Sequence, residues 1–486
     1  MTAHPSLTPA GPGAPHSVFS IRQRVALLVL LTASFTLAVD FSILNVALPR
    51  IGAEVGFGLA DLQWISTAFA VCAAGFTLLF GRLADLFGRR RQFLAGIALL
   101  GAASLVGGLA DEPWLLLVAR VAQGIATAAV TPAALSLLTT SFPEGAMREK
   151  ALGINGALMA AGFTMGAVLG GLLTDLISWR WAFFVNVIVA AAVLVIGPAV
   201  LKETRALQRR RLDAAGAVTV TSALVAGVYG LTQAGQHSWG DMRSWGPLGV
   251  AAVLVVAFLL IERAAPEPLV PLRVLSRRTT GWGNIAGILA FATQTSVVFL
   301  LTVFLQEVRG YTPLQAGLTF AVMGAGTVIG GTIAPRVIGG IGGRRAIVAG
   351  LVVQGLATIP LAFLSELGAW LVVLLTATFI GGVANLVAIV GFMVTATSGL
   401  PDAEQGLATG LATMSQQIGI ALGTPVMSAI VTAAAGAAAG IAAGGTTPVL
   451  TGVSTALAIN AAVCFAGAVL TAFAIPRSPR SRVSSH

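Results

Sequence analysis

Residues 182–200, AFFVNVIVAAAVLVIGPAV, decide the class of protein, because this run contains no charge and only one polar side chain, Asn186. A helix of this length reaches about 30 Å, the thickness of the hydrocarbon core of a bilayer. Hydrophobic residues make up 56% of the 486-residue chain and charged residues only 9%, against about 25% charged in soluble domains. The chain therefore belongs in a membrane.

Similar apolar runs recur along the chain and predict fourteen membrane-spanning helices. We place them at 25–47, 62–81, 93–111, 114–140, 150–174, 182–200, 215–235, 246–262, 281–305, 315–338, 346–365, 369–397, 407–433 and 452–475. An even number of crossings puts both termini on the same side of the membrane.

The positions of the 28 Lys and Arg residues identify that side. Only Arg50, Arg180, Arg243 and Arg309 fall on the side opposite the termini, and Arg120 lies within a span. Because basic residues collect in cytoplasmic loops, both termini are expected in the cytoplasm. The net charge of +10 thus reflects topology, and we expect no nucleic-acid partner. Residues 1–20 are rich in Pro and Gly and have no apolar run after a basic stretch, so we expect no cleaved signal peptide.

The sequence offers little for catalysis or for binding a metal. All four histidines lie outside the predicted spans, and the two cysteines, Cys72 and Cys464, lie inside different spans. No Ser/His or His/Glu constellation is visible, so neither an enzyme nor a cofactor is expected. We also expect no cytoplasmic ATPase domain, so an ion gradient or a partner is expected to supply the energy for any transport.

An internal repeat divides the chain. Residues 81–91 align with 335–345 at an offset of 254, and Gly153, Gly166 and Gly170 recur at an offset of 253 as Gly406, Gly419 and Gly423. Duplicated bundles are common among transporters.

We therefore expect an all-α integral membrane protein with two six-helix bundles. The predicted segments are a cytoplasmic tail at 1–24, a first bundle at 25–200, a central segment with two inserted helices at 201–280, a second bundle at 281–475 and a cytoplasmic tail at 476–486.

Two charged residues lie inside predicted spans, where an ionised group costs about 2.5–3.5 kcal/mol or more. Asp40 is the acidic residue placed well inside a span, and Arg120 lies about two turns into another. A carboxylate that alternates between lone burial and contact with a cation changes its affinity for protons. We expect Asp40 to carry a proton and Arg120 to assist it. The alternatives are a permanent salt bridge or a helix-end position facing water for Asp40, and a fixed structural cation for Arg120.

Glycines spaced four apart allow helices to approach closely in lipid. Gly162, Gly166 and Gly170, followed by Gly171, form the most pronounced such face. Plain helix packing and a moving hinge are both open as its role.

These motifs resemble the major facilitator superfamily, and in particular its fourteen-span drug/proton antiporter family. The residues that carry the resemblance are LAVD at 37–40 with NVALP at 45–49, GRLADLFGRRR at 81–91, RVAQG at 120–124, the glycine face, WRW at 179–181 and GYTPLQAG at 310–317. Ala167 and Ile188 stand where that family usually has proline.

The resemblance implies residue roles. Gly81, Asp85, Gly88, Arg89 and Arg90 would form a cytoplasmic gating motif, with Asp85 facing the amino end of the span at 407–433. The RVAQG motif would take part in proton coupling, and the glycine motif would characterise an exporter. In the second half Gly339 stands in place of Asp85, so the latch would be asymmetric.

The expected function is proton-driven export of a drug, antibiotic or secondary metabolite through a central cavity. Candidate cavity residues are Asp40, Asn45, Gln123, Asn155, Phe163, Gln294 and Gln417, although polar residues on buried faces also bond neighbouring helices. Nutrient uptake in the same fold is the alternative, and a membrane enzyme or structural protein is a remote one. With 26 arginines beside two lysines, we expect a GC-rich bacterial source, a plasma-membrane location and a monomer that exchanges protons for its substrate.

Overall fold

The computed structural model describes residues 20–58, 61–141, 146–203, 213–236, 241–266, 268–270, 272–364, 369–398, 402–439 and 447–476. The regular structure of these residues is helical. The helices are α1 (Ile21–Ile43), α2 (Leu48–Val55), α3 (Gln63–Phe87), α4 (Arg89–Gly108), α5 (Pro113–Ser141), α6 (Ala146–Leu176), α7 (Trp181–Val200), α8 (Ala214–Gln236), α9 (Met242–Ala264), α10 (Leu272–Leu275), α11 (Arg278–Val303), the π-helical turn η1 (Phe304–Val308), α12 (Pro313–Ile341), α13 (Gly343–Thr358), the 3₁₀ turn η2 (Ile359–Phe363), α14 (Trp370–Thr397), α15 (Asp402–Ala439) and α16 (Thr447–Ala474).

Each predicted span falls on one long helix of this series. Within the described residues, 11 helices are both long and apolar enough to cross a membrane. The three other long helices that coincide with predicted spans, α3, α6 and α8, do not meet this measure over their described residues. A multi-helix membrane protein is thus confirmed, and the count of fourteen crossings stays a prediction.

The first span ends earlier than the sequence predicts. Helix α1 stops at Ile43, a turn follows, and the short helix α2 begins at Leu48. Pro49 explains the break, because in a continuous helix its ring would clash with the carbonyl group of Asn45 and it has no N–H to donate. The sequence analysis missed α2 because this eight-residue helix lies outside the predicted spans, and Pro49, Arg50 and Glu54 give it no long apolar run.

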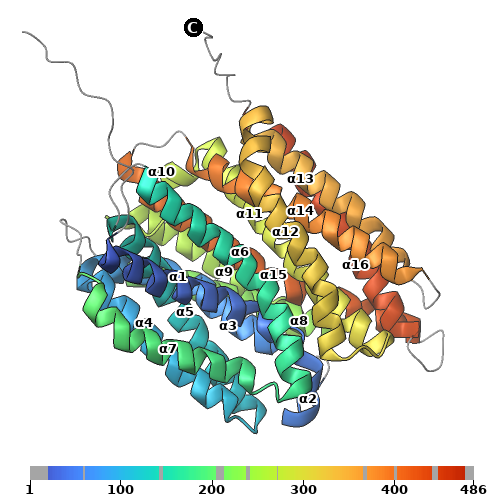
Figure 1. The fold of residues 1–486 in the computed structure, drawn as a ribbon. Helices are drawn as coiled ribbons and strands as arrows, with labels where there is room; N and C mark the ends of the chain where they lie inside the picture. Colours follow the sequence, from blue (N-terminus) through green and yellow to red (C-terminus); the bar gives the residue numbers. More distant parts are fainter. Residues whose placement is uncertain are drawn as a thin grey trace, which may run out of the picture.

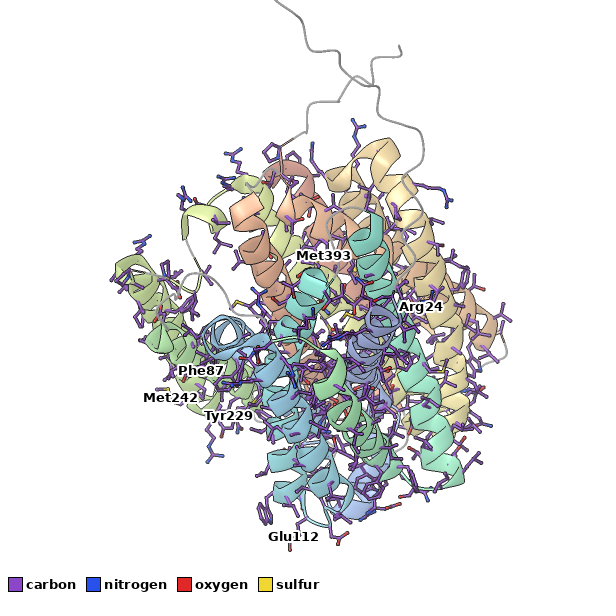
Figure 2. The ribbon with its side chains drawn as sticks, turned by 60° about the vertical axis from the view of Figure 1, so that its left-hand side comes forward. Arg24, Phe87, Glu112, Tyr229, Met242 and Met393 are labelled. Atoms are coloured by element: carbon purple, nitrogen blue, oxygen red, sulfur yellow. The ribbon has the colours of Figure 1, made fainter. Side chains whose placement is uncertain are left out.

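The helices form two groups that follow the order of the chain. In Figure 1, α1 to α7 lie on one side and α11 to α16 on the other, with α6 and α12 meeting between them. Helices α3 and α15 pack together elsewhere along the junction. Helix α8 packs against α3, α15 and α9, and Figure 2 shows Tyr229 of α8 and Met242 of α9 at one flank of the molecule.

Close helix contacts depend on glycine. A Cβ atom added to Gly166 of α6 would lie 2.7 Å from the carbonyl oxygen of Val39 in α1, and one added to Gly419 of α15 would lie 2.5 Å from that of Ile288 in α11. The glycines that recur at an offset of 253 therefore do the same work in corresponding helix pairs. Close helix packing therefore accounts for the glycine face, and a role as a moving hinge stays a prediction.

Candidate functional site

A buried ion pair lies inside the first group of helices. Arg120 of α5 places Nη1 at 3.2 Å from Oδ2 of Asp40 in α1. Asp40 is 0% exposed and Arg120 is 1% exposed. Two charges can persist in such surroundings only if they are paired and fully hydrogen-bonded.

Neutral polar groups complete the surroundings of the Asp40 carboxylate. The side-chain amide of Asn186, in α7, donates a hydrogen bond to Oδ1 of Asp40. Nε2 of Gln123 lies 3.4 Å from the same oxygen and also donates to the Ser104 hydroxyl of α4 at 2.8 Å. Asp40, Ser104, Arg120, Gln123 and Asn186 thus join four helices, and we call them the Asp40 cluster.

Arg120 is also held from its other sides. Its Nε donates to the carbonyl oxygen of Ile65 in α3 at 2.8 Å, and its Nη1 donates to Oε1 of Gln123 at 2.8 Å. The guanidinium carbon lies 4.3 Å from the centroid of the Phe69 ring, a cation–π contact. Arg120 is therefore held from several sides, and both oxygens of the Asp40 carboxylate accept hydrogen bonds.

The structure brings together residues that the sequence analysis singled out separately. Asp40, Arg120 and Gln123 form one cluster. Ser104 was missed, and Asn186 was not assigned a role. Asn186 had a signal of its own, as the one polar side chain in residues 182–200. Glu262, buried at the end of α9, was missed as well; its Oε2 accepts a hydrogen bond from the Val270 amide at 2.9 Å.

A second buried polar cluster lies at the corresponding place in the other group of helices. Thr293 of α11, located 253 residues after Asp40, accepts a hydrogen bond at its hydroxyl from Gln354 of α13 at 3.1 Å. Asn385 of α14 donates to Gln354 at 3.0 Å, and Asn460 of α16 donates to the Thr293 carbonyl oxygen at 3.1 Å. These four side chains are buried and uncharged. The corresponding helices thus meet around a neutral residue where the first group has Asp40.

The remaining predicted cavity residues lie apart from the Asp40 cluster. Asn45 accepts a hydrogen bond from Ser66 at 3.0 Å, and Gln294 donates to the Met323 sulfur at 3.3 Å. Asn155 in α6 and Gln417 in α15 are half-buried, and the side chain of Phe163 lies outside the described residues. Bonding between helices accounts for Asn45 and Gln294; a role toward substrate stays a prediction.

The predicted gating motif forms the turn between α3 and α4. Gly88 has φ of 108°, which favours glycine. The Glu203 carboxylate, just after α7, accepts hydrogen bonds from the amides of Arg90 and Arg91, each at 3.2 Å. A carboxylate at a helix amino end satisfies otherwise unpaired N–H groups. Glu203 is a partner that the sequence analysis did not identify.

The rest of the predicted gating motif lies on both sides of this turn. Gly81 lies within α3, and Arg89 is the first residue of α4. The side chain of Asp85 and those of residues 402–407 lie outside the described residues. The contact between them stays a prediction.

The two groups of helices touch at the end of the molecule where α2 lies (Figure 1). Asp175 of α6 accepts a hydrogen bond from the Leu314 amide at the start of α12 at 3.0 Å. Gln306 donates to the Val46 carbonyl oxygen at 2.8 Å. A Cβ atom on Gly317 would lie 2.7 Å from the Ala167 carbonyl oxygen. We call these contacts the α2-end closure.

At the same end of the molecule, the carboxylate of Glu54 in α2 contacts the loop before α7. Glu54 accepts a hydrogen bond from the Trp179 indole at 2.8 Å, and Arg50 and Arg180 lie 3.2 and 3.5 Å from its carboxylate. Burial alone would raise the pKa of Glu54, but the hydrogen bonds from Trp179 and Arg50 and the charges of both arginines outweigh it and lower the pKa below 4.5. The ionised Glu54 carboxylate therefore connects α2 to the loop before α7 through a hydrogen bond with Trp179 and an ion pair with Arg180.

Comparisons with known proteins agree with this architecture. A family model described as Major Facilitator Superfamily matches residues 30–424. The cephamycin export protein CmcT of Amycolatopsis lactamdurans is 38% identical over 412 residues, covering 81% of this chain and 82% of the relative. The puromycin resistance protein pur8 of Streptomyces alboniger is 34% identical over 460 residues, covering 93% of this chain and 90% of the relative.

Solved structures share the fold at much lower sequence identity. The crystal structure of PepTSo, a POT family transporter, matches with a TM-score of 0.67 at 14% identity, covering 92% of this chain and 97% of that one. The human organic anion transporter MFSD10 matches with a TM-score of 0.60 at 15% identity, covering 92% of this chain and 99% of that one. At such identity the likeness concerns the fold alone.

Proposed function

The chain belongs to the Major Facilitator Superfamily, and from this premise we propose that it exports an antibiotic or a related amphipathic drug from a bacterial cell in exchange for protons. The relatives named for cephamycin export and puromycin resistance support the direction and the substrate class. A lincomycin resistance protein of Streptomyces lincolnensis, 33% identical over 400 residues, points the same way.

The Asp40 cluster is the observation that carries the proton-exchange part of the proposal. Its carboxylate is buried, and its neighbours are an arginine and two amides that donate to it. In this geometry a proton competes directly with Arg120 and Asn186 for the carboxylate oxygens. A rearrangement of α1 against α5 or α7 that removes a donor would let Asp40 bind a proton, and restoring the contacts would expel it.

One carboxylate is sufficient for useful work. A proton that moves down a membrane potential releases about 2.3 kcal/mol per 100 mV. This free energy sustains an accumulation ratio of about fifty for a neutral substrate. Protons are the proposed coupling ion, and the transport cycle that we propose requires no cofactor.

Alternating access needs two groups of helices that close at either end in turn. We propose a first bundle of α1 and α3 to α7, a second of α11 to α16, and α8 with α9 as two inserted helices, fourteen crossings in all with both termini in the cytoplasm. On that topology the α2-end closure lies on the outer side, and the structure corresponds to a state closed to the outside. The bonds from Leu314 and Gln306 support this assignment.

Drug efflux in an exporter-deficient bacterial host tests the proposal. Cells that produce the wild-type protein are expected to tolerate more puromycin or cephamycin and to lose this tolerance when a proton uncoupler is added. Asp40→Asn is expected to abolish efflux at unchanged membrane expression. Glu112→Gln, which neutralises an exposed acid bonded to Trp114, is the matched control and is expected to keep it.

Two outcomes would contradict the proposal. Efflux that an uncoupler leaves unchanged would exclude protons as the energy source. Drug accumulation inside energised cells, rather than loss, would favour uptake by symport in the same fold.

A further inference from the structure

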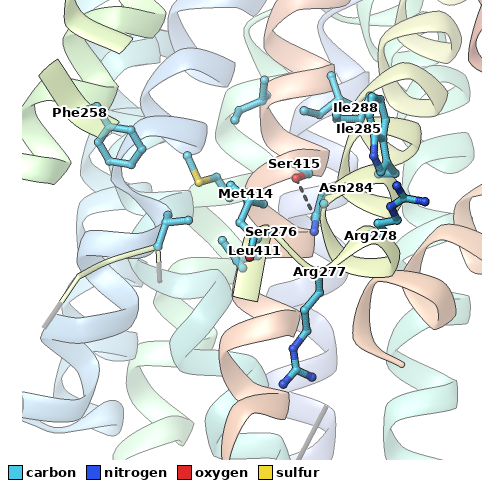
Figure 3. A pocket seen from close by; sticks show the side chains of 15 residues that line it. Phe258, Ser276, Arg277, Arg278, Asn284, Ile285, Ile288, Leu411, Met414 and Ser415 are labelled. Carbon is cyan, nitrogen blue, oxygen red and sulfur yellow. Dashed lines mark hydrogen bonds between the residues drawn. The ribbon is translucent and has the colours of Figure 1, made fainter. Parts of the chain in front are cut away.

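A cavity of about 450 Å³ lies between the inserted helix α9, the short helix α10, α11 and α15, away from the Asp40 cluster (Figure 3). The function proposed above does not use it. Its volume lies within the range of about 300–1,000 Å³ that is usual for small-molecule sites. Helix α9 and the segment before α11 form one wall, so the inserted pair contributes to it.

The cavity is lined mainly by apolar side chains. They include Phe258 of α9, Trp282, Ile285 and Ile288 of α11, and Leu411 and Met414 of α15. Trp282 is 36% exposed and Ile285 40% exposed. In a membrane protein, an apolar surface that is open on the side of the helix bundle faces lipid chains. The cavity can therefore be filled from within the bilayer.

The polar lining has a definite place. Asn284 and Ser415 line the cavity and are buried. The Ser415 hydroxyl donates a hydrogen bond to the Asn284 side-chain oxygen at 2.8 Å. Arg277 and Arg278 lie at the start of α11, and Figure 3 shows Arg277 pointing away from the apolar end at Ile288. Among the described lining residues no side chain is acidic.

The charged side chains that line the cavity therefore have one sign, and they lie near the amino end of α11. Arg277 is the N-cap residue of α11 and gives its helix no side-chain cap, and a helix amino end also favours an anion. On the proposed topology these arginines lie at the cytoplasmic surface, where anionic lipid headgroups are found.

We propose that this cavity binds an anionic phospholipid of the cytoplasmic leaflet, with an acyl chain between α9, α11 and α15 and the phosphate beside Arg277 and Arg278. Such a lipid would fill the space between the inserted helices and the second bundle. An amphipathic anionic drug has the same chemistry and is the other possible source of the ligand, which the experiment separates.

The experiment uses the full-length protein in nanodiscs that contain phosphatidylethanolamine with or without phosphatidylglycerol. Retained lipid is counted by native mass spectrometry after transfer to detergent. The wild type is expected to retain phosphatidylglycerol in preference to phosphatidylethanolamine, and the double variant Arg277→Gln, Arg278→Gln is expected to lose about tenfold of that preference. Arg345→Gln, which removes an exposed arginine from the start of α13, is the matched control and is expected to keep it.

A second variant tests the apolar part of the cavity without changing charge. Met414→Trp fills space between α9 and α15 and is expected to lower retention of both lipids at this site. The proposal is overturned if the arginine variant and the wild type retain phosphatidylglycerol equally, since that result describes lipid bound anywhere on the surface. It is also overturned if an anionic drug displaces the lipid and the arginine variant loses efflux of that drug but keeps efflux of others. The cavity would then be a substrate site.

Discussion

The coupling between Asp40 and Arg120 can be measured through folding as well as through transport. Arg120→Met removes the cation but keeps a side chain of similar length, so the Asp40 carboxylate stays buried at 0% exposure without its charged partner. Asp40→Asn removes the anion and leaves an amide that still accepts hydrogen bonds from Asn186 and Gln123.

The structure indicates the size of the effects. Breaking a buried ion pair on one side costs about 3–5 kcal/mol, because the remaining charge is uncompensated. Replacing both charged groups is far milder. The free-energy cost of Arg120→Met is therefore expected to be about 2–3 kcal/mol smaller in a protein that already carries Asp40→Asn than in the wild type. Part of the cost remains because Arg120 also bonds the Ile65 carbonyl oxygen and packs on Phe69.

Unfolding of the four proteins in mixed detergent micelles, followed by circular dichroism, gives this coupling free energy. Arg345→Met serves as the control for loss of an exposed arginine. The expected pattern is partial recovery of stability in the double variant with no recovery of drug efflux. Strictly additive costs, within about 0.5 kcal/mol, would refute the interaction between the two charges.

Three further predictions concern other parts of the molecule. Gly166→Leu should push α6 off the Val39 carbonyl oxygen of α1, lowering both the melting temperature and efflux, whereas Gly436→Leu, where a Cβ atom would meet nothing, should lower neither. The lowered pKa of Glu54 means that it stabilises the fold above pH 4.5 and loses that contribution as the pH falls through its folded-state pKa; melting between about pH 6 and pH 3 should therefore drop less in Glu54→Gln. Asp175→Asn should weaken the bond to Leu314 and the α2-end closure, seen as faster labelling of an engineered cysteine beneath it, and unchanged labelling would contradict that role.

The positions of the helices could be predicted well from the sequence, because lipid requires long apolar runs and each run fell on one long helix. The exact ends were harder to predict. Helix α2 was missed because it is only eight residues long and carries Arg50 and Glu54, so it shows no membrane-spanning apolar run.

The charged members of the Asp40 cluster could be predicted for an energetic reason. A charge inside a span is costly, so Asp40 and Arg120 stood out individually. Ser104 and Asn186 are neutral and inexpensive to bury, so nothing in the sequence says that they meet, and only the packing of α4, α5 and α7 brings them together. The repeat offset of 253 relates Asp40 to Thr293. This offset could have been used to predict that a neutral residue takes the place of Asp40 in the second group of helices.

Glu203 shows a different limit. The sequence placed it in a charged connection after the sixth predicted span, where any of several arginines is a plausible partner. The structure shows that it accepts hydrogen bonds from the backbone amides of Arg90 and Arg91, and that the Nε atom of Arg91 lies 3.9 Å from its carboxylate. Side chains that bind backbone groups leave no complementary residue type in the sequence to identify them.

Proton movement in proteoliposomes tests the central claim most directly. Wild-type protein is reconstituted with a pH-sensitive dye inside the vesicles, and a transported drug is added with no membrane potential. The drug gradient is expected to drive a counterflow of protons, and Asp40→Asn is expected to abolish this proton flux while the protein still binds the drug and remains folded. Proton counterflow of wild-type size in Asp40→Asn would contradict the assignment of Asp40 as the coupling residue.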